Sequence, residues 1–266
     1  MKKVRLDKLL VDKNIIESRE KAKKYIKTGN ILVNGKKIRK PSTKINEESS
    51  IEIINDPIPY VGRGGLKLEK ALRTFDISCK DKVAMDIGAS TGGFTDCMLK
   101  NGATKVYAID VGHGQLANKL KDDKRVINME GRNIRYVKLE DLEELADFVT
   151  IDVSFISLKL VLPKVIEITK ANVDVVALVK PQFEAGKEKV GKKGVVKDLK
   201  VHKEVLNDIN SFCIDNNLTI IDLTYSPIKG GEGNIEYLAH IKRGIHSNFN
   251  IDNKIDGIAV KSHKNL

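Results

Sequence analysis

Charged side chains follow three apolar segments of this sequence. Asp110 and Asp152 each end such a segment, and Lys180 follows the nearly all-apolar segment 173–179. Each segment is expected to form a strand of an open α/β sheet, where ligands bind at the carboxyl ends of the strands. A carboxylate there can accept hydrogen bonds from ribose hydroxyls, and a lysine can act as a base or as a point charge on a reacting oxygen. Asp152 could instead be only the cap of a helix.

A glycine-rich turn lies earlier in the chain, in the stretch VAMDIGASTGGF at residues 83–94. The pattern predicts a strand, a turn containing Gly88, Gly92 and Gly93, and then a helix over residues 95–100. Glycine lets the backbone turn tightly and lets a ligand approach without Cβ atoms in the way. The stretch therefore indicates the first unit of a nucleotide-binding sheet, with an ordinary strand-to-helix turn as the alternative.

The ligand of this turn is expected to be S-adenosylmethionine rather than a dinucleotide. The turn lacks the third glycine of GxGxxG, and Asp110 follows Asp86 by 24 positions, near the spacing of a ribose-binding acid. The segment MEGRNI at 129–134 could cover the adenine ring or be a simple loop. The residues expected to bind the cofactor are Asp86, Gly88, Ser90, Gly92, Gly93, Phe94, Asp110 and Asn133.

Strand-like and helical segments alternate from residue 83 onward. The predicted strands are 83–86, 105–109, 125–128, 148–152, 173–179, 218–223 and 235–242. Helices are expected to begin in 152–157 and to occupy 198–217. The glycine-rich basic segment 186–197 cannot build a core, and it suits a mobile lid, an RNA clamp or a flexible solvated loop. Residues 244–266 are polar and contain lysines, and the sequence gives them no clear role.

Composition narrows the class of protein. The chain has 266 residues, a hydrophobic fraction of 41%, a net charge of +11 and a pI near 9.3, which indicates a folded protein with a polyanionic partner. It has no run of 18 apolar residues and no signal-peptide core, so stable membrane association is not expected. Three widely spaced cysteines without CxxC suggest neither disulfides nor a zinc site. A reduced, cytoplasmic setting fits these features best.

The N-terminal segment carries most of the charge. Residues 1–56 contain fifteen Lys or Arg and eight Asp or Glu, a net charge of +7. Leucines at helical spacing, a helix capped by Ser18 and an Asn34-Gly35 hairpin signal predict two short helices and a small sheet. Two prolines then place a linker at 57–63, so we expect a domain with a phosphate-binding surface at 1–56, a second domain at 64–243 and a tail at 244–266.

RLDKLL followed by SREKAKKYIKTGNILVNGKKIRKPS resembles the S4-type RNA-binding domain, over Arg5 to about Ile54. In that family the second helix and the turn after it face RNA. The resemblance therefore implies RNA contacts for Arg5, Arg19, Lys23, Lys24 and Lys36, although such charges can also form a merely solvated face.

The remaining motifs resemble the TlyA (haemolysin-A) family of ribosomal RNA 2′-O-methyltransferases, which is related to the FtsJ-type enzymes. They are RGGLKLEKAL, MDIGASTGGFTDCML, AIDVG, TIDVSFISL, LVKPQFEAG, GVVKD and SPIKGGEGNIEYL. The resemblance implies a seven-stranded Rossmann-like sheet and a Lys-Asp-Lys-Glu tetrad around the reacting ribose, here Lys67, Asp152, Lys180 and Glu236. Periodicity alone marks Lys67 as a surface lysine. Glu232 also lies close to the fourth position, and Glu236 is preferred because it falls in the Gly-Asn-Ile-Glu-Tyr match.

The resemblance implies methyl transfer from S-adenosylmethionine to a ribose 2′-hydroxyl of ribosomal RNA, with cytidine as the nucleotide, and ribosomal RNA or ribosomal subunits as the partner. Methylation of a cytosine carbon is disfavoured because that chemistry needs a cysteine near the strand ends, whereas Cys97 and Cys213 fall in predicted helices. The other classes considered are a non-catalytic RNA-binding or ribosome-assembly factor and a membrane-lytic haemolysin. The lack of an apolar span disfavours the haemolysin.

Overall fold

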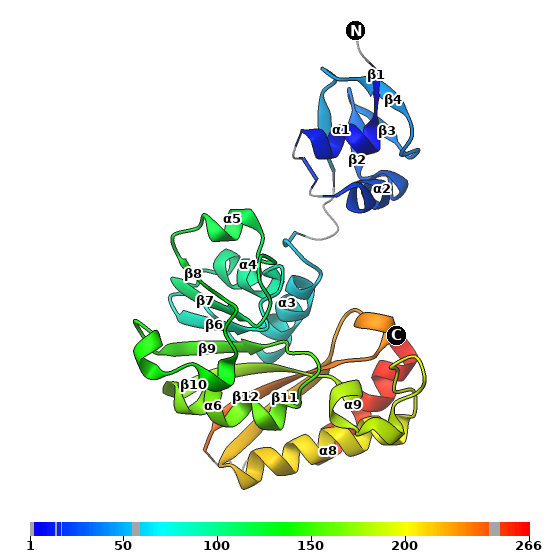
Figure 1. The fold of residues 1–266 in the computed structure, drawn as a ribbon. Helices are drawn as coiled ribbons and strands as arrows, with labels where there is room; N and C mark the ends of the chain where they lie inside the picture. The colour runs from blue at the N-terminus through cyan, green and yellow to red at the C-terminus, as the bar shows by residue number, and fades with distance from the viewer. Residues whose placement is uncertain (1–2, 14, 17, 55–58, 245–250) are drawn as a thin grey trace. The chain divides into compact units, whose positions relative to one another are not determined.

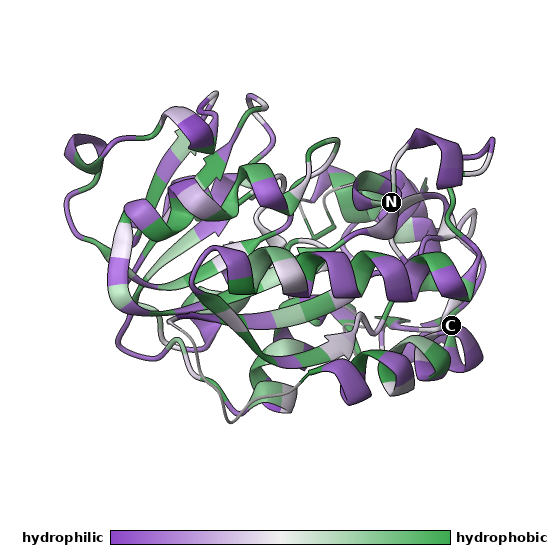
Figure 2. Cartoon of the chain, turned by 90° about the horizontal axis from the view of Figure 1, so that it is seen from below, coloured by the Kyte–Doolittle hydropathy of each residue, from purple (hydrophilic) through white to green (hydrophobic). Residues whose placement is uncertain are grey.

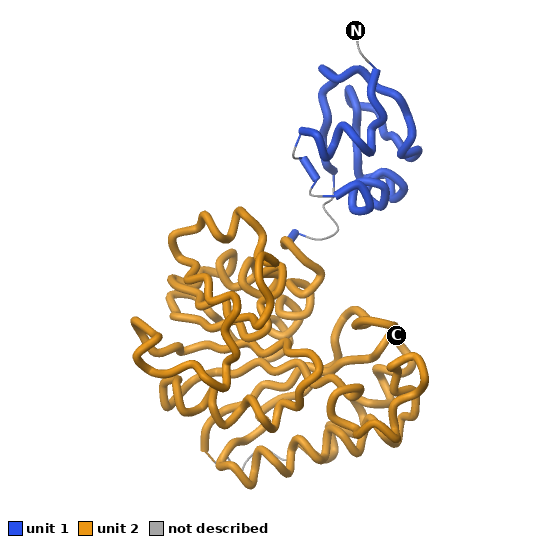
Figure 3. Tube along the Cα trace, viewed as in Figure 1, with its two compact units in different colours: residues 1–59 blue, residues 60–266 orange. Residues whose placement is uncertain are grey.

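The chain divides into two compact units in a computed structural model (Figure 3). The structure describes residues 3–13, 15–16, 18–54, 59–244 and 251–266. The first unit comprises residues 1–59 and the second residues 60–266. The predicted linker, 57–63, begins outside the described residues, and its second half belongs to the larger unit. Tyr60 and Val61 are buried there, and the Val61 N–H donates to an Asp96 carboxylate oxygen at 2.9 Å.

The smaller unit has two short helices and two small antiparallel sheets. Ser18 caps the second helix by accepting a hydrogen bond from the Lys21 N–H, as its sequence predicts. Leu6, Leu10 and Ile26 lie in a buried apolar cluster beneath the sheets. The elements are β1 Lys3–Arg5, α1 Leu6–Asp12, α2 Arg19–Lys27, β2 Ile31–Val33, β3 Lys36–Ile38, β4 Lys44–Asn46 and β5 Ile51–Ile53, with sheet orders β1-β4 and β3-β2-β5.

The larger unit is built on a seven-stranded sheet in the order β11-β12-β10-β9-β6-β7-β8 (Figure 1). Neighbouring strands from β10 to β8 are parallel, whereas β12 is antiparallel to both of its neighbours. The predicted Rossmann-like methyltransferase sheet is therefore confirmed. The strands are β6 Val83–Ile87, β7 Lys105–Asp110, β8 Val126–Glu130, β9 Ala146–Ile151, β10 Thr169–Val179, β11 Leu218–Tyr225 and β12 Tyr237–Arg243.

Helices cover both faces of this sheet, because its strands are apolar on both sides. Ala84 packs with helices α3 and α4, and its neighbour Met85 belongs to the cluster containing helices α6, α8 and α9. Figure 2 shows hydrophobic and hydrophilic residues interspersed along the helices, as expected for helices with one buried face. The helices are α3 Gly64–Phe75, α4 Gly93–Lys100, α5 Asn118–Lys121, α6 Leu162–Glu167, α7 Pro181–Glu184, α8 Leu199–Asp215 and α9 Asp252–Asn265. Single 3₁₀ turns occur at η1 Ile134–Tyr136, η2 Leu139–Asp141, η3 Leu158–Leu160, η4 Lys187–Lys189 and η5 Gly231–Gly233.

One prediction about local structure is wrong. No helix begins within 152–157, because Phe155 adopts a positive φ of 63° that a right-handed helix does not accept. The sequence gives residues 244–266 no clear role, and their described part forms a helix. This helix, α9, buries Ile255 and Ala259 in the core shared with α8.

Candidate active site

Four charged residues meet at one edge of the sheet. Asp152 directly follows β9, Lys180 directly follows β10, and Glu236 directly precedes β12. Because β12 runs antiparallel to β10 and pairs Tyr237 with Val179, its start lies beside the end of β10. Lys67 comes from α3, which covers one face of the same sheet. The sheet topology thus assembles residues that are up to 169 positions apart in sequence.

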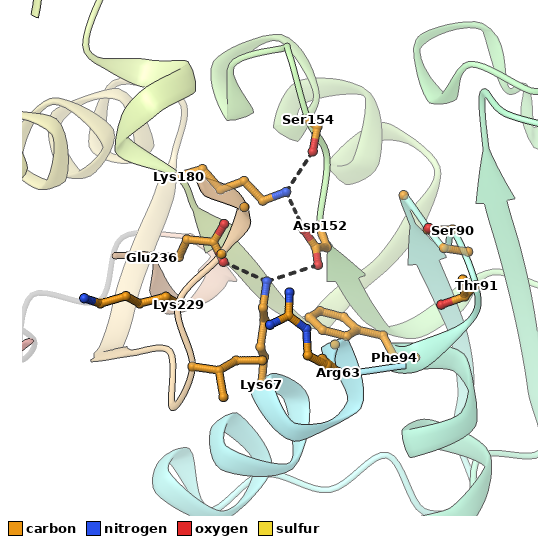
Figure 4. Close-up of a pocket in the computed structure, with 17 residues that line it drawn as sticks. Arg63, Lys67, Ser90, Thr91, Phe94, Asp152, Ser154, Lys180, Lys229 and Glu236 are labelled. Carbon is orange, nitrogen blue, oxygen red and sulfur yellow. Dashed lines mark hydrogen bonds and ion pairs between the residues drawn. The ribbon is translucent and has the colours of Figure 1, made fainter. Parts of the chain in front are cut away.

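The four side chains form one continuous set of ion pairs (Figure 4). Lys67 Nζ lies 2.7 Å from Glu236 Oε2 and 3.7 Å from Asp152 Oδ2. Lys180 Nζ lies 2.6 Å from Asp152 Oδ1 and donates to Ser154 Oγ at 3.0 Å. An ammonium group has three N–H donors, so these two contacts leave Lys180 one position for another oxygen.

Burial makes these contacts interdependent. Lys67, Lys180 and Glu236 are 8%, 7% and 2% exposed, so none of them can exchange its partner for bulk water. Two positive and two negative side chains balance, which offsets the cost of burying each charge. Removing one partner from such a set leaves a buried charge uncompensated, at a cost of about 3–5 kcal/mol.

The tetrad of Lys67, Asp152, Lys180 and Glu236 lines a cavity of about 300 Å³. The glycine turn forms the opposite wall, and Gly88, Ser90, Gly93 and Phe94 all line the cavity. Figure 4 shows that Arg63 and Lys229 also contribute to it. The predicted catalytic residues and part of the predicted cofactor turn therefore share one cavity.

Gly88 is required at the point where the turn meets Asp152. Its φ is +83°, a conformation that residues with a Cβ rarely adopt. A Cβ at this position would also lie 2.8 Å from the carbonyl carbon of Asp152 and closer still to the carbonyl oxygen. Gly88 therefore allows the backbone of the glycine turn to lie in direct contact with the backbone of Asp152.

A second cavity, of about 500 Å³, extends from the same turn toward β7. Asp110 and Asn133 line it, together with Ile109, Val111 and Ile134, which supply an apolar surface. The two cavities share Gly88, Ser90, Asp152 and Ser154, so a ligand could lie in both.

Asp110 also organises the loops around this second cavity. Its Oδ2 accepts from the Ser90 N–H at 2.8 Å and its Oδ1 accepts from the Gly112 N–H at 2.7 Å. Each carboxylate oxygen can accept a second hydrogen bond, so both can still receive a ribose hydroxyl.

Two predicted cofactor contacts, Asp86 and Gly92, lie outside both cavities. Asp86 is fully buried, and its carboxylate accepts from the Thr95 N–H at 2.8 Å, the Thr95 hydroxyl at 2.6 Å and the Thr150 hydroxyl at 3.0 Å. Gly92 has a φ of +91° and packs against Leu120. Both residues lie behind the turn and support it, and their direct contact with the cofactor stays a prediction.

Burial raises the pKa of Asp86 from 3.8 to about 6, against the lowering effect of the Thr95 and Thr150 hydrogen bonds. Since the pKa is higher in the folded state, protonated Asp86 favours folding at low pH, and this contribution is lost as pH rises through about 6. Between pH 4 and 7 we expect the free energy of unfolding to fall by about 2 kcal/mol more in the wild type than in Asp86→Asn. Urea unfolding of both proteins at each pH measures this difference, and parallel curves would contradict it.

Phe155 and Phe183 are site residues that the sequence analysis did not select. Phe155 is 92% exposed, and its ring lies 5.0 Å from the ring of Phe183, which lies 5.7 Å from Lys180 Nζ. Both rings line a third cavity, of about 650 Å³, that shares Lys180 and Glu236 with the first. The motif Asp152-Val-Ser-Phe could have indicated Phe155 as a site residue. A large apolar side chain in an exposed loop that follows a strand of the site is not buried in the core, and such exposed apolar groups often bind ligands.

The predicted RNA-binding residues lie on the smaller unit. Arg5 and Arg19 each donate to the buried Asp7 carboxylate at 3.0 Å, and hydrogen bonding by Arg5 lowers the pKa of Asp7 to about 2. Lys23 Nζ pairs with Glu20 at 2.6 Å. Lys24 and Lys36 are exposed. The two arginines are therefore oriented by Asp7 while they keep about half of their side-chain surface exposed.

Among the described residues, no group of three or more His, Cys, Asp or Glu side chains is arranged to hold a metal ion. No helix in the described ranges combines the length and the apolar character that crossing a membrane requires.

Comparison with known proteins agrees with this arrangement. The FtsJ-like methyltransferase model matches residues 60–243, and the S4 domain model matches residues 4–51. YqxC of Bacillus subtilis, a candidate rRNA methyltransferase, is 52% identical over 90% of this chain and 86% of its own length. The 16S/23S rRNA (cytidine-2′-O)-methyltransferase TlyA of Mycobacterium tuberculosis is 36% identical over 91% of this chain and 90% of its own.

A solved structure of a candidate hemolysin from Streptococcus thermophilus matches the whole chain and 97% of that protein, with a TM-score of 0.78 and 44% identity. The seven-stranded sheet, the family models and the curated relatives agree with one another. The chain belongs to the FtsJ-like methyltransferase family, as a relative of the TlyA and YqxC rRNA methyltransferases, and carries an S4 domain at its N-terminus.

Proposed function

We propose that this protein transfers a methyl group from S-adenosylmethionine to a ribose 2′-hydroxyl of ribosomal RNA, with cytidine as the modified nucleotide. The observation that carries the proposal is the ion-paired tetrad of Lys67, Asp152, Lys180 and Glu236 beside the glycine turn. TlyA of Mycobacterium tuberculosis, whose name states this reaction, supports the choice of substrate. Ribosomal RNA as substrate would place the reaction in the cytoplasm.

The cavities fit this cofactor. Asp110 would accept hydrogen bonds from the ribose hydroxyls, and Val111 and Ile134 would contact the adenine ring. Asn133 lies in the same wall and could bind an adenine edge. Gly88 and Gly93 would let the methionine part approach the backbone closely.

The cofactor supplies an activated methyl group on a sulfonium centre, so the protein has to align the acceptor oxygen and assist loss of its proton. As an ammonium, Lys180 would hold the developing negative charge through the N–H that Asp152 and Ser154 leave open. As a neutral amine, it would keep its two N–H groups on Asp152 and Ser154 and take the proton with its lone pair. Asp152 would orient Lys180. Lys67 and Glu236 would fix the ribose and hold Asp152 from the other side.

The S4 domain would provide the other half of RNA recognition. Arg5, Arg19, Lys23, Lys24 and Lys36 are the residues proposed to contact RNA phosphates there. Such contacts position the substrate without reading its sequence. The nucleotide itself would be selected by the cavities around the tetrad.

The direct test is methyl transfer to ribosomal RNA. Purified protein is incubated with radiolabelled S-adenosylmethionine and ribosomal RNA from a strain that lacks this chain, and the product is digested and mapped by mass. A mass gain that stays with the ribose after the base is removed is the expected result. A gain that leaves with the base, or none in RNA or in intact ribosomal subunits, would overturn the proposal.

Phe155→Ala is expected to lower methyl transfer without lowering stability. The exposed ring is proposed to stack on a nucleotide base of the substrate, and stacking of this kind contributes about 1–3 kcal/mol per base. This free energy corresponds to a loss of about 5-fold to 150-fold in kcat/KM for RNA. Steady-state kinetics with wild type, Phe155→Ala and Phe155→Tyr measure the effect, and Tyr should restore most of the rate because it can still stack. Equal kinetics for all three proteins would remove Phe155 from the site.

A further inference from the structure

A lysine-rich cavity adjoins the active site of the larger unit. Its volume is about 860 Å³. Among the described residues that line it, Glu232 is the one acidic side chain, and the last residue, Leu266, also lies on the wall. The lysines that line it are Lys189, Lys192, Lys193, Lys197 and Lys229.

The loop that carries most of these lysines is held in place by buried side chains. Asn234 is 3% exposed; its Nδ2 donates to the Gly194 carbonyl at 2.9 Å, and its Oδ1 accepts from the Val196 N–H at 3.2 Å. The fully buried His202 contacts the Val196 carbonyl at 2.9 Å. The lysines therefore project from a fixed backbone, although the sequence suggests a mobile or flexible loop as readily.

The positive charge of the cavity is largely uncompensated. Lys189 pairs with Glu204 at 2.8 Å. Within the described ranges, the other four lysines make no ion pair with an acidic side chain. The wall also contains His263, whose buried Nε2 has no hydrogen-bond partner among the described residues. A ligand with several anionic oxygens would neutralise the four lysines that lack an ion pair.

The cavity adjoins the proposed reaction site. Lys229 lines both this cavity and the cavity of the tetrad, where Figure 4 shows it beside Glu236. Asn234, which holds the lysine loop, lies two positions before Glu236. A polyanion bound along the lysines would therefore run directly toward Lys180 and Glu236.

We propose that this cavity binds the phosphates of single-stranded RNA next to the modified ribose. The methyltransferase unit would then hold its substrate through a phosphate-binding track of its own, in addition to the S4 domain. The inference rests on the proposed function, because it takes RNA as the polyanion. Lysines bind phosphates as point charges, so the track would fix the path of the strand and leave base selection to other residues.

The test compares two double variants of the full chain. Lys192→Gln/Lys193→Gln removes two charges from the track, and Lys80→Gln/Lys124→Gln removes two exposed charges that precede β6 and β8, at the opposite edge of the sheet. Binding of a fluorescent single-stranded RNA of about 20 nucleotides is measured as a function of salt. The slope of log affinity against log salt should become shallower by about 1.4 in the first variant, or about 0.7 for each lost phosphate contact.

Steady-state kinetics of methyl transfer to the RNA substrate provide the second measurement. The track variant should show a raised KM for RNA with an unchanged kcat, because it loses binding that ground and transition states share. A slope and KM equal to those of the control variant would overturn the proposal. It would also fail if polyglutamate competed as well as RNA at equal charge, since the surface would then bind any polyanion.

These outcomes separate the track from the function. If the wild type methylates no ribosomal RNA, the proposed function fails, whereas the salt slope still reports whether the lysines bind phosphate. If the wild type methylates RNA and the two double variants behave alike, only the track fails.

Discussion

Replacing Lys180 by methionine is expected to lower kcat for methyl transfer by about 10²-fold to 10⁴-fold, the usual contribution of a positioned acid or base. Methionine keeps much of the side-chain volume and removes the nitrogen that lies between Asp152 and Ser154. Single-turnover transfer at saturating RNA and cofactor measures the change. A wild-type rate in a variant that still binds RNA and cofactor would contradict the role of Lys180.

The matched control is Lys170→Met. Lys170 lies on the same strand, β10, near its other end, and pairs with Asp147 at 2.7 Å on the surface. The Lys170→Met variant therefore loses a lysine and an ion pair, and the candidate active site is unchanged. Lys180 is buried and Lys170 is exposed, so replacing Lys180 could also lower the stability of the protein. Melting temperatures of both variants show whether a lower rate reflects lost chemistry or lost folding.

Gly88→Ala is expected to abolish cofactor binding at ordinary concentrations and to destabilise the protein. The new Cβ would meet the Asp152 backbone, and the positive φ adds about 1–2 kcal/mol of strain for a residue with a side chain. Because the turn and Asp152 would have to move apart, both the cofactor cavity and the tetrad would change. Calorimetric titration with S-adenosylmethionine and thermal unfolding measure the two effects.

Gly114→Ala separates the two causes. Gly114 has a φ of +69°, and a Cβ there would have no heavy atom within 4 Å. Gly114→Ala should therefore have the backbone strain of a positive φ without a steric clash. We expect a small loss of stability and a cofactor affinity near that of the wild type. If Gly88→Ala were no worse than Gly114→Ala, the close approach to Asp152 would be unimportant.

The sheet could be predicted from the sequence because its signal is local. Each parallel strand is a short apolar run followed by a polar or glycine-containing turn, as in 173–179 followed by Lys180. The predicted start of β10 is four residues too late. The strand begins at Thr169, and residues 169–172 show too little alternation of apolar and polar side chains to indicate a strand.

The tetrad could not be assembled from local patterns. On α3, Lys67 is buried on the same side as Leu68 and Ala71, and its charge there is paired with Glu236, which is 169 positions away. Resemblance to a family supplied that pair, whereas spacing alone predicted a surface lysine. The sequence does not indicate Phe155 as a site residue, because its segment predicts the start of a helix, whereas the structure has a loop with a positive φ there.

The sequence of helix α9 contains a helical repeat of apolar residues, although the segment is polar on average. Ile251, Ile255 and Ala259 recur every four residues, which forms one narrow apolar stripe. Gly257 within the helix and the surrounding lysines and aspartates weaken the pattern. The stripe suffices because α8 and β11 offer a preformed surface for it.

The position of β12 in the sheet constrains how a newly made chain folds. In the sheet that the described residues form, β11 is an edge strand whose neighbour is β12, and β12 separates it from β10. As the ribosome releases the chain from its N-terminus, β11 emerges with no partner to pair with, and it joins the sheet only after β12 has been synthesised. A chain cut short before Glu236 would keep the glycine turn and Asp110 while lacking a complete tetrad. On the proposed function, translation must therefore pass Glu236 before the first methyl group can be transferred.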